Sequence, residues 1–383
     1  MTGVTFIHMK YMGSKRAMLQ NGLGDLLSRE AVTAHRFVDL FTGSGAVAAY
    51  VAMRFPIPVL AFDLQRYGAI LAGAVINRQT SLNWKFIWRN WYHRAESYFN
   101  TYEIPAGDNV TKVVVADFRA WCNQQTNLPI TQAYGGHYFS PEQAVWIDSL
   151  RLSLPEREPG RTVALAALIQ AASQSAAAPG HTAQPFQPTR TAIRFIKEAW
   201  NKDIVAKTQT AFEVLASQFA QYPGQATVTD ANLAAMQLQE GDLAFIDPPY
   251  SGVHYSRFYH VLETIADGNC GGVTGVGRYP AREKRPRSKY SVCSESGGAL
   301  GDLLAKVSNR GARAVLTFPD HSCSNGLGGD SVREIAAQHF HIREMHVESQ
   351  FSTLGGTGDE RHEEGGRAAR RSAKELMLIL EPR

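Results

Sequence analysis

The sequence has no long apolar run and no targeting segment that stands out. No stretch of about 18 apolar residues occurs, and the best run, at residues 163–178, is interrupted by Gln and Ser. The first residues carry positive charge but lack the apolar core of a signal peptide. We therefore expect a soluble cytoplasmic protein without a membrane partner.

Cysteine is also scarce, and charge of one sign is only slightly in excess. The four cysteines, at positions 122, 270, 293 and 323, include no C-x-x-C pair, which argues against a zinc site and a disulfide framework. We expect no metal. Lys and Arg number 39 against 35 Asp and Glu, a balance that favours a polyanionic partner without identifying one. With 44% hydrophobic and 19% charged residues, the chain is neither a disordered tail nor a coiled coil.

Short β-rich runs alternate with helical patterns over much of the chain. Strands are predicted at residues 36–41, 58–62, 112–116, 243–246, 313–318, 341–348 and 375–380, and helices follow the first three at 46–54, 66–78 and 120–125. This alternation predicts an α/β fold with a doubly wound, mostly parallel sheet. Only a Gly-rich loop separates the last two strands, so we expect an antiparallel hairpin at the sheet edge.

Two inserts interrupt this pattern. Residues 126–235 read as helical, at 141–152, 163–178 and 191–219, so we expect a sheet domain of residues 1–125 and 236–383 with a helical insert at 126–235. The second insert, at about 267–298, is rich in Gly and Ser and carries one acid in its basic segment. The basic segment holds six cations, whose mutual repulsion favours phosphate groups as partners, with a solvated loop as the alternative: Arg278, Arg282, Lys284, Arg285, Arg287 and Lys289.

A glycine turn between a strand and a helix points to a nucleotide-like ligand. Residues 37–45 (FVDLFTGSG) place Gly43 and Gly45 where the chain turns tightly and a ligand approaches the backbone. Asp63 ends the next strand, where an acid can accept both ribose hydroxyls of an adenosine-containing cofactor. For Asp63 alone, a solvated helix cap is the alternative.

Asp117 and Phe118 follow the third predicted strand. They would supply an acid for an exocyclic amine and an apolar wall for a ring. Asp39, Asp63 and Asp117 would then form a line along the carboxyl edge of the sheet, which favours a cofactor site there.

Residues 246–250 (IDPPY) carry the strongest chemical signal. The two prolines fix φ and remove two N–H donors, which leaves a rigid backbone with free carbonyls. Asp247 and a proline carbonyl can then accept hydrogen bonds from one exocyclic amine, while Tyr250 offers a face for a planar base. A strand that merely ends in a proline turn is the alternative.

These segments together resemble a known family. Asp247-Pro248-Pro249-Tyr250, the loop at 41–45 (FTGSG) and the N-terminal run at 10–16 (KYMGSKR) are similar to the three signatures of alpha-class DNA adenine-N6 methyltransferases, and their order is typical of that class. The resemblance covers nearly the whole chain. It implies a Rossmann-like seven-stranded methyltransferase sheet, a target-recognition role for the helical insert, S-adenosyl-L-methionine as methyl donor and adenine in double-stranded DNA as acceptor.

The resemblance implies cofactor contacts at Tyr11, Lys15, Asp63 and Asp247. Family members often have Trp at the position of Tyr11, and Asp39 replaces a frequent Glu. With the residues derived above, the expected cofactor site is Tyr11, Lys15, Asp39, Phe41, Gly43, Gly45, Asp63, Asp117, Phe118 and Asp247. The expected catalytic residues are Asp247, Pro248, Pro249 and Tyr250.

The expected function is therefore site-specific adenine methylation of DNA in a restriction-modification or phage-defence setting, with a cognate restriction or defence component as a further partner. Two alternatives stay open: an RNA adenine methyltransferase, and a DNA-binding regulator whose active site has decayed. Asp247 instead of Asn argues against protein glutamine as acceptor, and Ser at that position would suggest cytosine.

Overall fold

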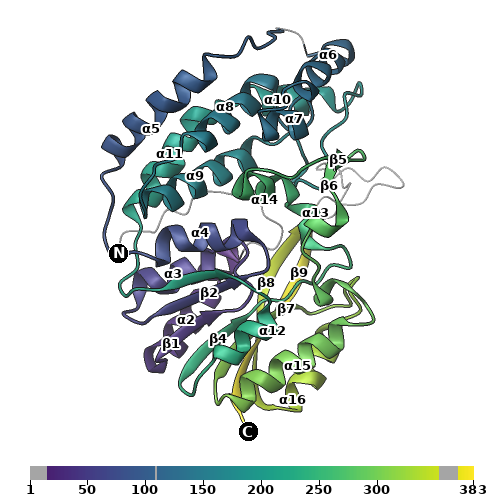
Figure 1. Cartoon of the computed structure of the whole chain (residues 1–383). Coiled ribbons are helices and arrows are strands. Elements are labelled where there is room, and N and C mark those ends of the chain that lie inside the picture. Colours follow the sequence, from purple (N-terminus) through teal and green to yellow (C-terminus); the bar gives the residue numbers. More distant parts are fainter. Residues whose placement is uncertain (1–14, 108–109, 353–369) are drawn as a thin grey trace. The chain divides into compact units, whose positions relative to one another are not determined.

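The computed structural model describes residues 15–107, 110–352 and 370–383, which belong to two compact units (Figure 1). The sheet unit consists of residues 15–72, 220–255, 287–352 and 370–383, and the helical unit of residues 73–107, 110–219 and 256–286. These limits differ from the predicted domain limits in three ways. The helical unit begins at residue 73 and not at 126, its main segment ends at residue 219 and not at 235, and it also includes residues 256–286.

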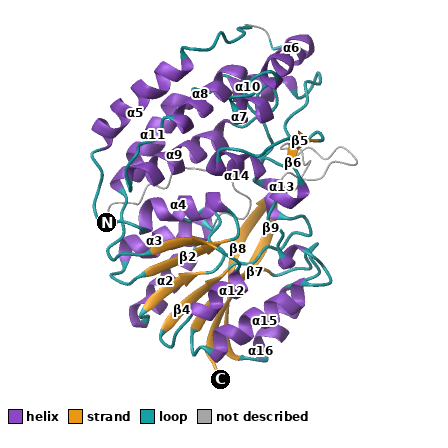
Figure 2. Cartoon of the chain, in the orientation of Figure 1, coloured by secondary structure: helices purple, strands orange, loops and turns teal. Residues whose placement is uncertain are grey.

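The sheet unit contains one seven-stranded sheet, in the order β3-β2-β1-β4-β7-β9-β8. Its strands are drawn in orange in Figure 2. Strands β1 (Arg36–Asp39), β2 (Val59–Asp63), β3 (Gln225–Val228), β4 (Asp242–Ile246) and β7 (Arg313–Pro319) are parallel. Strands β8 (Phe340–Ser352) and β9 (Arg370–Pro382) form an antiparallel hairpin at the edge. The predicted α/β class, Rossmann-like sheet and edge hairpin are confirmed.

Helices of the sheet unit pack on its apolar strands. They are α1 (Arg16–Gln20), α2 (Leu23–Glu30), α3 (Ala46–Arg54), the first part of α4 (Arg66–Ile76), α12 (Ala231–Ala234), α15 (Ser296–Asn309) and α16 (Gly329–Ala337), with 3-10 turns at Ala31–Thr33, Ala235–Gln237 and Lys289–Ser291. Alternate residues of β7 (Leu316, Phe318) and β9 (Leu376, Leu378) join Leu300 of α15 in one buried cluster. Because side chains alternate along a strand, the residues between them lie on the opposite face of the sheet.

One predicted strand is wrong, and one strand was missed. Residues 112–116 lie in α6 (Lys112–Asn123), where the Thr111 side chain accepts a hydrogen bond from the Val114 N–H. Val115, Phe118 and Cys122 are the buried residues of this helix. Their helical spacing prevails over the β-propensity of three consecutive valines. The seventh strand is instead β3, inside the stretch that was predicted to be helical.

Helices dominate the helical unit. They are α5 (Trp84–Phe99), α6, α7 (Pro129–Tyr134), α8 (Pro141–Leu152), α9 (Gly160–Ser175), α10 (Ile193–Trp200), α11 (Ile204–Ser217) and α14 (His260–Asp267). The unit also contains a short hairpin of β5 (Val273–Thr274) and β6 (Tyr279–Pro280) and a 3-10 turn at Arg282–Lys284. Helix α13 (Tyr255–Phe258) spans the limit between the two units. The long apolar run falls on α9, which is buried on nearly all sides. Within the described ranges, no helix has the length and apolarity needed to cross a bilayer.

Candidate active site

Several acids lie at the carboxyl edge of the sheet, where its parallel strands end. From β1 the chain adds β2 and β3 on one side, and β4 and β7 on the other. Ligands of open α/β sheets bind at such a reversal, outside the carboxyl ends of the strands. Asp39 ends β1, Asp63 ends β2, and Asp247 directly follows β4. The predicted acids at positions 39 and 63 therefore lie at the reversal point, on strands next to each other.

A further acid at this edge was missed in the sequence. Asp230 follows β3 and its side chain accepts a hydrogen bond from the Asn232 N–H at 2.9 Å, which caps α12. The alternating run 225–228 (QATV) followed by Thr-Asp was the available signal, but it is short and lies within a stretch dominated by helical patterns.

The glycine turn after β1 is held by Asp63. Gly43 and Gly45 both have positive φ, at 54° and 74°, which favours glycine. The Gly43 N–H donates to Asp63 Oδ2 and the Gln65 N–H to Asp63 Oδ1, each at 2.7 Å. Burial raises the pKa of Asp63 to about 6, although these hydrogen bonds act in the opposite direction. Asp63 thus orders the loop and keeps its remaining lone pairs for a ligand.

Asp39 is buried beside the same loop. Its side chain is 1% exposed, and Oδ1 accepts from the Phe41 N–H at 3.3 Å. Burial raises the pKa of Asp39, and the charges of Asp247 and Asp63 raise it further. This concentration of carboxylates would be stabilised by a positively charged ligand. Phe41 is half-buried and packs edge-on against Tyr290, with ring centroids 5.0 Å apart.

Two donors fix one oxygen of the Asp247 carboxylate. Lys15 Nζ lies 2.9 Å from Asp247 Oδ1, and the Thr317 hydroxyl donates to the same oxygen at 2.8 Å. Among the described residues, none donates a hydrogen bond to Oδ2. Burial and the charge of Glu375 raise the pKa of Asp247, whereas Lys15 and Thr317 lower it. The carboxylate is therefore oriented by one oxygen and can accept a hydrogen bond from a substrate with the other.

The backbone of the Asp-Pro-Pro-Tyr segment is braced by the loop after β7. Asn325 is fully buried, and its amide donates to the carbonyls of Pro249 at 2.9 Å and Tyr290 at 3.0 Å. The Gly252 N–H donates to the Ser324 hydroxyl at 2.9 Å. Thr317 and Asn325 were not predicted because neither lies in a recognisable motif, and their partners are about 70 residues away in sequence.

The aromatic side of the segment is formed by two tyrosines. Tyr250 is partly buried and lies edge-on to Tyr255, with ring centroids 6.4 Å apart. The contact with Tyr255 thus orients the Tyr250 ring.

Comparison with known proteins agrees with this geometry. Residues 11–276 match the model of the D12 class N6 adenine-specific DNA methyltransferase family. The chain belongs to this family. The match contains the glycine turn, the acids at the sheet edge and the Asp-Pro-Pro-Tyr segment.

Two relatives carry names that fit the family. The chain is 23% identical over 311 residues to "Modification methylase LlaI" of Lactococcus lactis subsp. lactis, over 78% of this chain and 44% of the relative. It is 26% identical over 312 residues to "Type II methyltransferase M.FokI" of Planomicrobium okeanokoites, over 79% of this chain and 43% of the relative. The chain therefore spans less than half the length of either relative.

Two of the residues expected to bind the cofactor do not follow a strand. Asp117 lies on the exposed side of α6, and Phe118 packs in an apolar cluster of the helical unit with Trp200. The prediction for these two residues assumed that residues 112–116 form a strand, and that assumption was wrong. Tyr11 lies outside the described residues.

The basic segment is divided between structural and exposed cations. Arg278 Nε donates to the Ala133 carbonyl at 2.8 Å and its Nη2 to that of Gln132 at 3.1 Å, so this side chain anchors the hairpin within the helical unit. Arg285 lies over the Tyr279 ring at 5.5 Å. The other four are exposed: Arg282, Lys284, Arg287 and Lys289. These four side chains are accessible for the predicted contacts with phosphates. The guanidinium of Arg278 instead donates hydrogen bonds within the protein.

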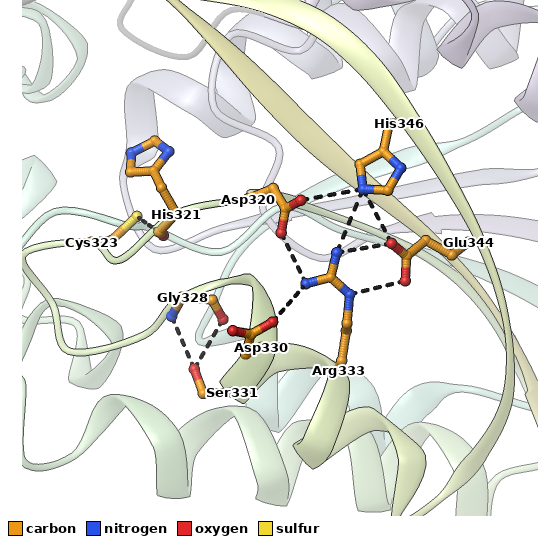
Figure 3. A network of polar contacts seen from close by, with 9 residues as sticks. All are labelled: Asp320, His321, Cys323, Gly328, Asp330, Ser331, Arg333, Glu344 and His346. Atoms are coloured by element: carbon orange, nitrogen blue, oxygen red, sulfur yellow. Dashed lines mark hydrogen bonds and ion pairs between the residues drawn. The ribbon is translucent and has the colours of Figure 1, made fainter.

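A charged network anchors the start of the bracing loop (Figure 3). Arg333 of α16 pairs with Asp320, directly after β7, at 2.9 Å and with Asp330 at 3.3 Å. The same guanidinium makes two hydrogen bonds to Glu344 of β8, at 2.8 and 2.9 Å, and His346 contacts Asp320 and Glu344. The network ties together α16, β8 and the loop that reaches Asn325.

Replacing Arg333 by Met is expected to lower the free energy of unfolding by about 1 kcal/mol at pH 7, since the network is partly exposed. Hydrogen bonds from Arg333 hold the pKa values of Asp320 and Glu344 below their usual range. Their contribution is complete above the unfolded-state pKa of about 4 and is lost as pH falls through the lower folded-state values. Urea titrations should therefore show the difference from wild type narrowing as pH falls from about 5 toward 3. A difference that stayed constant would contradict this origin. Arg310→Met, at an exposed site, is the control.

Proposed function

We propose that this chain is a site-specific DNA adenine methyltransferase that transfers a methyl group from S-adenosylmethionine to N6 of adenine in double-stranded DNA. The carrying observation is Asp247, whose carboxylate is fixed through Oδ1 and open at Oδ2, within an Asp-Pro-Pro-Tyr segment at the strand reversal. Family membership supports adenine in DNA as the acceptor. The names of the relatives, a modification methylase and a type II methyltransferase, support a role in restriction-modification. A cognate restriction or defence component as partner is part of the same proposal.

The acids at the sheet edge fit this methyl donor. S-adenosylmethionine is a sulfonium cation with ribose hydroxyls and an exocyclic amine. Asp63 would accept from the ribose hydroxyls, and Asp230 from the adenine amine of the cofactor. Burial raises the pKa values of Asp39 and Asp63, and a bound cation would favour the charged form of both carboxylates. The cofactor supplies a methyl group on an excellent leaving group, so the chain needs neither a nucleophile nor a metal for the transfer.

The residues of the site then position the acceptor. Asp247 Oδ2 and the Pro248 carbonyl accept hydrogen bonds from the two N6 hydrogens, which draws the nitrogen lone pair out of the ring system and directs it outward. The rigid di-proline backbone, held by Asn325, keeps both acceptors in place while the bond forms. An adenine inside a duplex must leave the base stack to reach this site, at a cost of a few kcal/mol. Tyr250 would receive the flipped ring.

The helical unit is proposed as the target-recognition part. It lies between segments of the sheet unit in sequence and includes Arg282 and Lys284. Phosphate contacts from such cations position a duplex without reading bases. Helices of this unit would supply the base contacts.

Binding of radiolabelled S-adenosylmethionine, followed by counting of methyl groups on DNA and on RNA, tests this proposal. We expect cofactor binding with counts on DNA only. Counts on RNA would favour the RNA methyltransferase alternative. Binding of DNA without methylation of any acceptor would favour the decayed regulator.

Replacing Asp63 by Ala should weaken cofactor binding. We expect the Kd of S-adenosylmethionine, measured by calorimetry, to rise by about 10- to 100-fold, because hydrogen bonds to a charged group contribute roughly 1.5–3 kcal/mol. The Gly43 and Gln65 N–H groups also lose their acceptor, so the loop itself should loosen. Asp25→Ala, an exposed acid of α2, is the control. A Kd equal to that of the control would exclude Asp63 from the cofactor site.

A further inference from the structure

Glu375, in β9, faces the site although no sequence signature marks it. It pairs with Pro319 in the β7–β9 ladder, and Thr317 pairs with Met377. Thr317 and Pro319 are two residues apart in β7, so their side chains lie on the same face of the sheet. Paired residues also share a face, and Glu375 therefore lies on the same face as Thr317. Its Oε2 atom lies 3.6 Å from Lys15 Nζ, and the side chain is 12% exposed.

The environment of this carboxylate is unusual for a purely structural residue. Oε2 is buried and has no hydrogen-bond partner within the described part of the chain. Lys15, itself 5% exposed, is closer to Asp247, at 2.9 Å. One ammonium therefore serves two carboxylates, and the second is held at longer range. Burying a carboxylate oxygen without a hydrogen bond costs stability, and a glutamine of the same shape would largely avoid that cost.

We propose that Glu375 is a positioning residue for methyl transfer, which holds the Lys15 ammonium beside Asp247 when that carboxylate engages the adenine amine. The inference rests on the proposed function. As Asp247 shares its charge with the substrate, its attraction for Lys15 weakens. Glu375 is then the second charge that attracts the ammonium, and it keeps Lys15 beside Asp247 through the reaction.

The charges around Glu375 predict a second measurable effect of this role, on the pH dependence of kcat. The charge of Glu375 acts on Lys15, Asp247, Tyr250 and Cys323, and the charge of Asp247 acts in turn on Asp39. The charge of Glu375 adds to burial in raising the pKa of Asp247. Removing that charge lowers the pKa of Asp247. Because the reaction needs Asp247 ionised, the acid limb of the kcat profile should move to lower pH.

Glu375→Gln, Glu375→Asp and the matched control Glu381→Gln, on the same strand, test the proposal. We expect Glu375→Gln to lower kcat by about 10- to 100-fold, to move the acid limb to lower pH, and to leave the free energy of unfolding unchanged or higher. Glu375→Asp keeps the charge, so the acid limb should stay in place and kcat should recover in part. Glu381 lies 3.8 Å from Arg343 and 3.9 Å from Arg313, and its variant should behave as wild type.

An unchanged kcat and acid limb in Glu375→Gln would overturn the proposal. So would a fall in unfolding free energy that accounts for the lost activity, because Glu375 would then only support the fold. The unfolding measurement requires no methyl acceptor, so its result does not depend on the proposed function. A wild-type protein that methylates no DNA would refute the proposed function, whereas a destabilised Glu375→Gln variant would refute the charge arrangement on its own.

Discussion

Replacing Asp247 by Asn is expected to lower kcat for DNA methylation by at least about 10³-fold, in line with the loss of a preorganised acceptor at a reacting group. Asn has the same shape, but an amide cannot match a carboxylate as an acceptor for the N6 hydrogen. The charge pair with Lys15 at 2.9 Å would also be lost. Single-turnover kinetics with saturating cofactor and DNA measure this effect on the chemical step.

The fold should persist in this variant. Asp247 follows the last residue of β4 and belongs to no apolar cluster, so the circular dichroism spectrum should be unchanged. Tyr250→Ala should likewise remove activity, because the flipped base loses its stacking partner. Asp25→Asn, at an exposed position of α2, is the control and should retain nearly full kcat. Near-wild-type activity in soluble Asp247→Asn would refute the assignment of the catalytic residue.

The second large effect is expected in DNA binding. Replacing Arg282, Lys284 and Arg287 by Ala should weaken binding to all duplex sequences alike. Each phosphate contact contributes about 0.9 to the slope of log affinity against log salt, so the slope should flatten by about 2.7 units. When the salt concentration rises from about 50 to 200 mM, both proteins lose affinity for DNA. The factor by which the variant's affinity falls should be about 40 times smaller than the factor for the wild type. Fluorescence anisotropy at several salt concentrations measures both slopes.

The control for this variant removes the same charge elsewhere. Arg29, Arg54 and Arg310 are exposed cations of the sheet unit, and their triple Ala variant should keep the wild-type slope. Equal slopes in the two triple variants would show that only net charge matters. A changed target sequence in the first variant would mean that the basic segment reads bases.

How much of the site could be predicted depends on where the information lies in the chain. Gly43, Gly45 and Asp247 were recognisable because the turn and the amine acceptor need a few particular residues in sequence. Thr317 and Asn325 act through contacts with residues about 70 positions away. No local pattern marks such residues, since a threonine in a strand or an asparagine in a loop is ordinary.

The fold shows the same division. The alternation of β1 with α3 and β2 with α4 was strong enough to predict a parallel sheet. Residues 112–116 were misread because three valines favour a strand, while burial of Val115, Phe118 and Cys122 on one helix face decides for α6. β3 was missed because it is a short edge strand with two exposed and two half-buried residues. Because β3 was missed, the end of the insert was predicted too late in the chain and Asp230 was not recognised.

Modification-sensitive sequencing of DNA from cells that express the protein tests the central claim most directly, with cells expressing Asp247→Asn as reference. The account predicts N6-methyladenine at one short recognition sequence throughout the DNA with the wild-type protein, and none above background with the variant. Unmodified adenine in both, or a methyl group on cytosine, would contradict it.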